Sequence, residues 1–418
     1  MNLPRTSIAL ALSIALLVAA CTPAANETTT SSTVTVTTSS TSVAPVTTTI
    51  ETTTTTEPPL AVVRVLGDVP SELAAAAGAF LSTVQDPRND AGDLDDGLLE
   101  HHASGAGMLA DEYTGVATTQ ELETGGSVAV VTLASGDLIL EADEGDGWKV
   151  VGAELSSIGL DPWFGESPRR VLIIGSDARP GGTAAYSNMD SIHIVTAVPE
   201  RSAGTILGYP RDSWVDTPYG EMRINALAAS KRGPEALFSQ FTQEWDIPLD
   251  GYILTAFSGF ERLIGAVLGR LFIDLPRSLP TQEFFAGFRA GEQRLTPTRT
   301  LDYARTRKGV PGGDFTRSQN QGLIMLATLT MLQQGSIEDV PMLLGELVKY
   351  TETNLTPTDL IQLGVAAFTL DVGEITNMVL PGKLGRATGG KSVVFLDPTA
   401  AGIVADVIDD GLLTPEDG

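Results

Sequence analysis

The chain has 418 residues, of which 42% are hydrophobic, and its formal net charge is −26. This length allows two or more domains, since one domain usually takes roughly 100–200 residues. The charge argues against a nucleic acid as partner, because binding to phosphate backbones depends on cationic surface. Cys21 is the only cysteine, which excludes an internal disulfide.

The first twenty residues have the pattern of a secretory signal peptide. Arg5 precedes an apolar segment over residues 8–20, which is too short to span a bilayer as a helix. Small residues then lead directly into Cys21, and this pattern resembles a bacterial lipobox. We therefore expect a signal peptide over 1–20 and lipidation of Cys21, which would anchor the protein to the extracytoplasmic face of the cell membrane. An ordinary signal peptide with an incidental cysteine is the alternative.

Two further segments precede the main domain. Residues 21–59 are predicted to form a disordered linker, because 22 of the 38 residues from 22 to 59 are Ser or Thr and cannot bury a core. Residues 60–160 are predicted to form a small acidic α+β accessory domain, with a helix and three strands at 71–84, 127–132, 137–142 and 148–153. The adjacent His101 and His102 have no further metal ligands nearby in sequence, and we expect both to be exposed.

Residues 165–385 are predicted to form the main domain, followed by a strand and helix extension over 386–418. Apolar strands alternate with amphipathic helices, which indicates an α/β fold: a three-layer α/β/α sandwich with a mixed central sheet. The expected strands lie at 171–174, 191–198, 203–208, 252–257 and 271–275, with late strands at 374–380 and 391–396. The expected helices lie at 233–245, 258–268, 298–306, 314–334, 337–350, 358–368 and 398–409.

Charged and polar residues gather where these apolar elements end. Asp177 and Arg179 follow the first core strand, and Asp190 begins the next. Ligand sites of open α/β sheets lie at strand ends, although Asp also simply caps turns. Three further clusters contain Arg211 with Asp212, Arg223 with Asn225, and finally Arg305, Arg307, Asp314, Arg317 and Gln321.

The spacing within the last cluster is informative. Asp314, Arg317 and Gln321 fall at i, i+3 and i+7, which is one face of a helix. A helix that begins at Asp314 would also point amide donors at a nearby anion. Arg305 and Arg307 can converge only if the preceding helix ends near Arg305.

Several arginines with two or three aspartates favour a diphosphate bridged by a metal ion. Guanidinium groups bind phosphate oxygens in pairs, and carboxylates hold hard cations such as Mg²⁺. The alternative is a set of surface Arg–Asp pairs, each of which contributes little to stability.

Residues 169–333 resemble the LytR–CpsA–Psr (LCP) domain, also called the cell envelope-related transcriptional attenuator domain. The segments that carry the resemblance are, in order, VLIIGSDAR, NMDSIHIV, TILGYPRDSWVD, RINAL, GYILTAFSGFERLIGAVLG, LDYARTRKG and GDFTRSQNQ. Members of this family transfer glycopolymers from polyprenyl diphosphate to peptidoglycan through a new phosphodiester, assisted by Mg²⁺. Where the family usually has Arg, two residues before the second Asp, this chain has Asn188.

The resemblance implies a phosphotransferase whose donor is a glycopolymer on polyprenyl diphosphate and whose acceptor is peptidoglycan. It implies that Asp177 and Asp190 hold Mg²⁺ (or Mn²⁺), and that one carboxylate among Asp177, Asp190 and Asp314 assists deprotonation of the acceptor hydroxyl. The implied phosphate-binding and supporting residues are Arg179, Arg211, Arg223, Asn225, Arg305, Arg307, Arg317 and Gln321. Apolar residues within 252–275 and 323–331 would line a lipid tunnel. A hydrolase of polyprenyl diphosphates and a non-catalytic envelope lipoprotein that binds lipid or polysaccharide remain as alternatives.

Overall fold

The computed structural model describes residues 61–67, 69–89, 94–179, 182–229 and 231–414. All of them lie within one compact unit, Glu57–Gly418. The expected signal peptide, the lipidation site Cys21 and the Ser/Thr-rich linker fall outside the described residues. Within the described ranges, no helix is both long enough and apolar enough to cross a bilayer.

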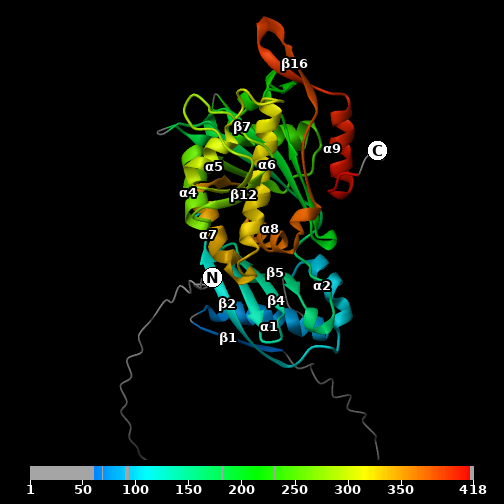
Figure 1. Cartoon of the computed structure of the whole chain (residues 1–418). Helices are drawn as coiled ribbons and strands as arrows, with labels where there is room; N and C mark the ends of the chain where they lie inside the picture. Colours follow the sequence, from blue (N-terminus) through cyan, green and yellow to red (C-terminus); the bar gives the residue numbers. More distant parts are fainter. Residues whose placement is uncertain (1–60, 68, 90–93, 180–181, 230, 415–418) are drawn as a thin grey trace, which may run out of the picture. The chain divides into compact units, whose positions relative to one another are not determined.

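The N-terminal part is a five-stranded sheet with helix α1 (Ser71–Gln85) on one face (Figure 1). Its strands are β1 (Val62–Leu66), β2 (Glu112–Glu121), β3 (Ser127–Leu133), β4 (Leu138–Asp143) and β5 (Trp148–Glu154). The helix and the last three strands are confirmed predictions. Strands β1 and β2 were not predicted. β2 is exposed or half-buried at nine of ten positions and lacks the apolar alternation that predicts a strand.

The prediction that both histidines are exposed is wrong for His102. This residue ends the short helix α2 (Asp96–His102), and its ring lies edge-on to Phe80 with 5.8 Å between centroids. Its Nδ1 atom is 2.9 Å from the carbonyl oxygen of Leu98. Residues four apart share one helix face, so the buried Leu98 carries His102 into the core with it.

A six-stranded mixed sheet forms the centre of the main domain, in the order β14–β11–β6–β7–β8–β15. β11 and β15 run parallel to their inner neighbours β6 and β8, whereas the other pairs are antiparallel. The strands are β6 (Arg169–Ser176), β7 (Met189–Val198), β8 (Ala203–Gly208), β11 (Gly251–Ala256), β14 (Glu352–Thr353) and β15 (Ile375–Val379).

Helices cover both faces of this sheet, which confirms the predicted three-layer α/β/α sandwich. Alternate residues Leu172 and Ile174 of β6 pack toward α3 (Pro234–Ser239), the π-helical turn after it (Gln240–Glu244) and α9 (Thr399–Asp410). The opposite face carries α4 (Phe257–Val267), α6 (Asp314–Leu332), α7 (Val340–Tyr350) and α8 (Pro357–Thr369). Because α9 packs in the same core as β6, the C-terminal segment is continuous with the main domain.

The expected strand at 271–275 exists but does not join the central sheet. β12 (Leu271–Leu275) pairs instead with β13 (Gly291–Leu295) in a separate two-stranded sheet. Its alternate residues Leu271, Ile273 and Leu275 are buried beside Tyr303 and Ile324. This separate core holds α5 (Pro297–Ala304) and the C-terminal half of α6 in place beside the central sheet.

A second hydrophobic core joins the N-terminal sheet to helices α7 and α8. Val130 and Leu140 of the sheet pack in one cluster with Leu344 of α7 and Ile361 of α8. A chain of buried hydrogen bonds runs through the same region: Arg169 Nη1 donates to Gln362 Oε1 at 2.6 Å, and Gln362 Nε2 donates to the Val151 carbonyl at 2.6 Å. The N-terminal sheet therefore braces the helices that stand over the central sheet.

Candidate functional site: an arginine–aspartate cluster at the mouth of an apolar cavity

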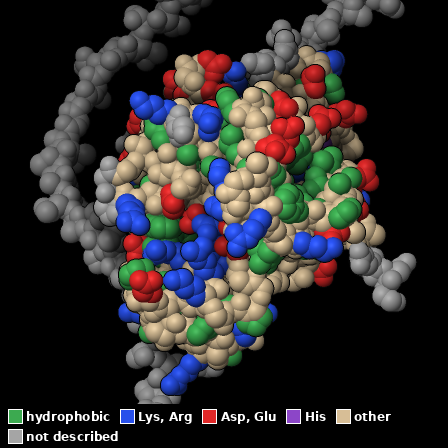
Figure 2. Space-filling model, turned by 90° about the horizontal axis from the view of Figure 1, so that it is seen from above, with side chains coloured by type: hydrophobic (Ala, Val, Ile, Leu, Met, Phe, Trp, Pro, Cys, Tyr) green, Lys and Arg blue, Asp and Glu red, His purple; other side chains and the backbone are tan. Residues whose placement is uncertain are grey.

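Four charged side chains from three segments form a network that we call the arginine–aspartate cluster: Asp190, Arg211, Asp314 and Arg317. Asp190 lies at the start of β7, Arg211 follows β8, and Asp314 and Arg317 occupy the first turn of α6. Arg317 Nη2 lies 3.0 Å and Arg211 Nε 3.6 Å from Asp314 Oδ1. Arg211 also donates to the Asp190 carboxylate, and Arg317 donates to the Asp190 carbonyl at 2.9 Å. Lys and Arg side chains gather around a few acidic ones on this face (Figure 2).

Both guanidinium groups of the cluster keep a donor that no acceptor among the described residues satisfies. Arg211 Nε and Arg317 Nε are buried without a hydrogen-bond partner, and the Arg317 side chain is only 6% exposed. An unsatisfied buried donor costs about 1–3 kcal/mol. Burial lowers the pKa of Arg317; Asp314 opposes this effect, and the positive charges of Arg211 and Arg307 add to it. An anion bound here would satisfy the free donors and offset the repulsion between these cations.

Arg223 extends the positive charge on one side of the cluster. Its Nη1 lies 3.6 Å from Asp212 Oδ1, and its Nε is another buried donor without a partner. Asn225 does not share a strand face with Arg223, because β10 (Met222–Arg223) ends there and a 3₁₀ turn follows. The Asn225 main-chain N–H donates to the Arg211 carbonyl at 3.0 Å, which places the turn directly against the cluster.

Among the described residues, Asp177 and Arg179 are outside the ion-pair network of the cluster. The Asp177 carboxylate accepts hydrogen bonds from the Asn188 main chain at 3.1 Å and from Asn188 Nδ2 at 3.4 Å. Over the described ranges, no ion pair joins either Asp177 or the exposed Arg179 to a charged side chain. Asp177 and Asn188 are the first and last residues of the loop between β6 and β7, so their hydrogen bonds join the two ends of this loop. This contact was not predicted from the sequence.

The remaining predicted residues lie around the first turn of α6. Helix α5 ends at Ala304, as expected, and the Arg305 guanidinium lies over the Phe257 ring, 4.6 Å from its centroid. Arg307 is exposed on the following turn and contributes positive charge near Arg317. Gln321, one turn after Arg317, donates to the Ala304 carbonyl at 3.2 Å. The predicted common face of Asp314 and Arg317 is confirmed by their 3.2 Å hydrogen bond.

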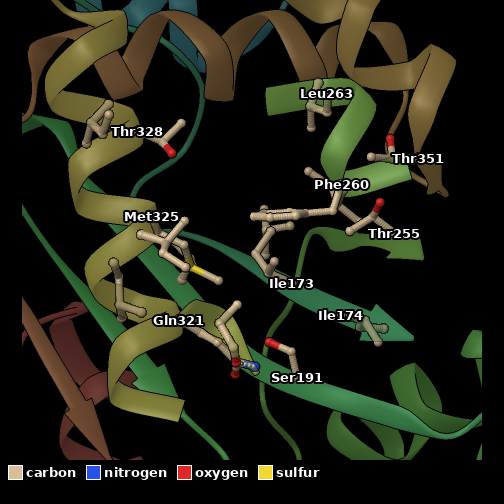
Figure 3. A pocket seen from close by; sticks show the side chains of 18 of the residues that line it. Ile173, Ile174, Ser191, Thr255, Phe260, Leu263, Gln321, Met325, Thr328 and Thr351 are labelled. Atoms are coloured by element: carbon tan, nitrogen blue, oxygen red, sulfur yellow. Dashed lines mark hydrogen bonds between the residues drawn. The ribbon is translucent and has the colours of Figure 1, made fainter. Parts of the chain in front are cut away.

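An apolar cavity of about 460 Å³ opens beside the cluster, between the central sheet and helices α4, α6, α7 and α8. Asp190, Arg305, Arg317 and Gln321 line its charged end. Figure 3 shows Ser191 and Gln321 at one end of this space, with Ile173, Phe260 and Met325 pointing into it. The expected lining segments contribute several residues between 253 and 264 and between 324 and 329, but β12 contributes none, because it lies in the separate two-stranded sheet. The contribution of β6, β7 and α8 to the cavity lining was not predicted, because their inward-facing residues have the pattern of ordinary core residues.

The charged end of the cavity offers carboxylates rather than a preformed metal centre. In the part of the chain that the structure describes, no three His, Cys, Asp or Glu side chains come together as metal ligands. Asp177 directly follows β6, and Asp190 lies at the start of β7. These two strands are neighbours, since Ser176 of β6 pairs with Met189 of β7. A substrate that brings its own oxygen ligands would be needed to complete a cation shell here.

Comparisons with known proteins identify the family of the chain. The family model for the LytR_cpsA_psr family matches residues 156–405. The polyisoprenyl-teichoic acid–peptidoglycan teichoic acid transferase TagV of Bacillus subtilis is 30% identical over 205 residues, which are 46% of this chain and 51% of that protein. The chain thus spans about half the length of this relative. The regulatory protein MsrR of Staphylococcus aureus is 25% identical over 248 residues, which are 57% of this chain and 74% of that protein.

A solved structure supports the same assignment. The crystal structure of TagV from Bacillus subtilis aligns with a TM-score of 0.51 and 26% sequence identity, and the match covers 60% of this chain and 100% of that chain. The α/β architecture and the family match over more than half of the residues lead to one conclusion: the chain belongs to the LytR–CpsA–Psr family.

Proposed function

We propose that the protein is a glycopolymer–peptidoglycan phosphotransferase that uses a polyprenyl diphosphate-linked donor. One observation carries the proposal: buried guanidinium donors of Arg211 and Arg317 lack partners at the charged end of an apolar cavity. A lipid chain suits the cavity, and a diphosphate suits the unsatisfied donors. The named transferase activity of the relative TagV supports the same reaction class.

The expected reaction exchanges one phosphorus–oxygen bond for another. The acceptor hydroxyl oxygen attacks the phosphorus on the glycan side, the bond from this phosphorus to the bridging oxygen breaks, and polyprenyl phosphate leaves. Arg211 and Arg317 would bind the diphosphate oxygens and stabilise the charge that develops on the leaving phosphate. Arg223, Arg305 and Arg307 would extend this positive field around the same group.

The hydroxyl proton requires an acceptor, and we assign this role to Asp177. Asp190 and Asp314 are both ion-paired with guanidinium groups of the cluster. Among the described residues, the Asp177 carboxylate accepts hydrogen bonds from Asn188 only, so lone pairs of this carboxylate remain available for the hydroxyl proton. Geometry comes before basicity in choosing a general base. Asp177 directly follows β6, whose Ser176 pairs with Met189 next to Asp190, and this pairing places Asp177 at the edge of the site.

Mg²⁺ (or Mn²⁺) fits the carboxylates of this edge. Asp177 and Asp190 are hard oxygen donors, and Mg²⁺ in proteins is usually held by one or two carboxylates together with substrate phosphates. When bound, the ion would neutralise part of the diphosphate charge. We further propose that the expected lipid anchor at Cys21 holds the protein at the extracytoplasmic membrane surface, where a polyprenyl carrier would be within reach.

The test is a product analysis with the purified full chain, a synthetic glycan on polyprenyl diphosphate and a peptidoglycan fragment. Polyprenyl phosphate released together with a glycan–peptidoglycan phosphodiester supports the proposal. Release that yields only a free glycan phosphate, independent of acceptor, would instead establish the hydrolase. Donor binding without any release, at every Mg²⁺ concentration, would establish the non-catalytic binding protein.

A further inference from the structure

The β-hairpin formed by β16 (Gly382–Arg386) and β17 (Ser392–Leu396) has an unusual charge distribution for this acidic chain. Residues 351–418 contain ten acidic residues and three cations, Lys383, Arg386 and Lys391, and all three cations lie on the hairpin. Residues 382–396 contain no Asp or Glu. The hairpin is therefore a cationic patch on a protein whose net charge is −26.

The cations of the hairpin are largely free to meet a ligand. Lys383 Nζ lies 3.6 Å from Asp397 Oδ2, but its side chain is 84% exposed. Arg386 and Lys391 are exposed, and over the described ranges neither has a carboxylate within ion-pair distance. Arg386 donates to the Gly390 carbonyl at 3.1 Å. Two large apolar side chains, Leu384 and Phe395, are exposed on the same hairpin.

The hairpin is attached directly to the segment that carries Arg211. The Val394 N–H donates to the Asp212 carbonyl at 2.9 Å, and Val394 also forms a bridge with Ser213. The Lys391 ammonium lies 5.9 Å from the centroid of the Trp214 ring. Figure 1 shows the hairpin projecting beyond the central sheet into solvent. A ligand on the hairpin would thus lie beside the arginine–aspartate cluster.

We propose that the β16–β17 hairpin, with Trp214, is the docking surface for the acceptor glycan strand, whose chemistry is that of a carboxylate-bearing polysaccharide. This inference rests on the proposed function. In phosphoryl transfer the attacking and leaving oxygens lie roughly in line across the phosphorus. The leaving polyprenyl phosphate is tied to the cavity, so the acceptor hydroxyl must approach from the solvent side, where the hairpin stands. Lys and Arg suit the carboxylates of the strand, and exposed apolar side chains suit the flat faces of its sugar rings.

The test measures binding of the full chain to purified peptidoglycan sacculi stripped of other glycopolymers, without any donor. The double variant Arg386→Glu/Lys391→Glu is expected to bind sacculi about tenfold more weakly, because two attractions become repulsions. The control Arg64→Glu/Arg88→Glu makes the same charge change on exposed residues of the N-terminal sheet region and should stay within about twofold of the parent. Sacculi with amidated carboxyl groups should bind the parent about as weakly as native sacculi bind the hairpin variant.

Donor turnover measured in parallel separates the two proposals. If the hairpin variant and the control lose sacculus binding equally, or if the hairpin variant loses donor affinity and keeps sacculus binding, the acceptor surface is refuted. If the parent binds sacculi through the hairpin but never releases polyprenyl phosphate, the phosphotransferase fails while the binding surface stands.

Discussion

Arg317 is the residue whose removal tests the site most directly. Its guanidinium donates to the Asp190 carbonyl at 2.9 Å and lies 3.0 Å from Asp314 Oδ1. Arg317→Ala removes both contacts, and Arg211 remains 3.6 Å from Asp314 to compensate in part. We expect a loss of about 2 kcal/mol in unfolding free energy, because a buried carboxylate loses its nearest partner. We expect turnover to fall about 100-fold or more, since a preorganised cation facing the reacting phosphates is lost.

Thermal unfolding and release of polyprenyl phosphate measure these two effects separately. Arg299→Ala is the matched control: Arg299 pairs with Asp302 at 3.1 Å and donates to two main-chain carbonyls at 2.9 Å, but it does not line the cavity. The control should lower stability and leave turnover of the folded protein within about threefold of the parent. Arg317→Ala with near-parental turnover, or equal loss in both variants, would refute the assignment of Arg317 to the diphosphate.

Three further perturbations probe the buried core, the cavity and the metal. His193 is fully buried between Ser191 and Ser318, and burial lowers its pKa from 6.5 to about 4. The unfolded chain therefore takes up the proton at a higher pH than the folded protein does. The free energy of unfolding should be complete above pH 6.5 and fall by about 3 kcal/mol as the pH decreases to 4, which chemical unfolding at each pH will measure. Thr328→Trp places an indole in the apolar cavity and should weaken binding of a polyprenyl phosphate probe about tenfold, measured by fluorescence displacement. Removal of divalent cations with a chelator should stop turnover, and Asp190→Asn should raise the Mg²⁺ concentration needed to restore it.

The first two of these predictions have a control variant within the chain. His193→Gln should flatten the pH dependence of stability, whereas His101→Gln, at an exposed position, should leave it unchanged. Thr330→Trp adds the same ring on the exposed side of α6 and should leave probe binding intact. Turnover that persists in full with the chelator present would remove Mg²⁺ from the proposal without affecting the role of the arginines.

Local sequence patterns anticipated most of the elements around the site because these patterns report burial with a fixed period. The i, i+3, i+7 spacing from Asp314 to Gln321 predicted a common helix face, and the short apolar run at 171–174 predicted a buried strand. Strand β2 was not predicted because its residues are mostly exposed or half-buried. The prediction for His102 was wrong because a helix of seven residues is too short for its periodicity to show which face is buried.

The sequence by itself determined the types of the elements and the series of segments that resemble the LytR–CpsA–Psr family. Both depend only on residues that are close together in the sequence. Only the tertiary structure decided which charges meet. Arg211 and Arg317 come from distant segments and converge on Asp190, whereas Asp177, nearer to Asp190 in sequence, bonds to Asn188 instead. Sheet order and helix packing set these distances, and neither can be read from residue spacing. The same packing adds inward-facing residues of β6, β7 and α8 to the cavity lining that was predicted only from residues 252–275 and 323–331.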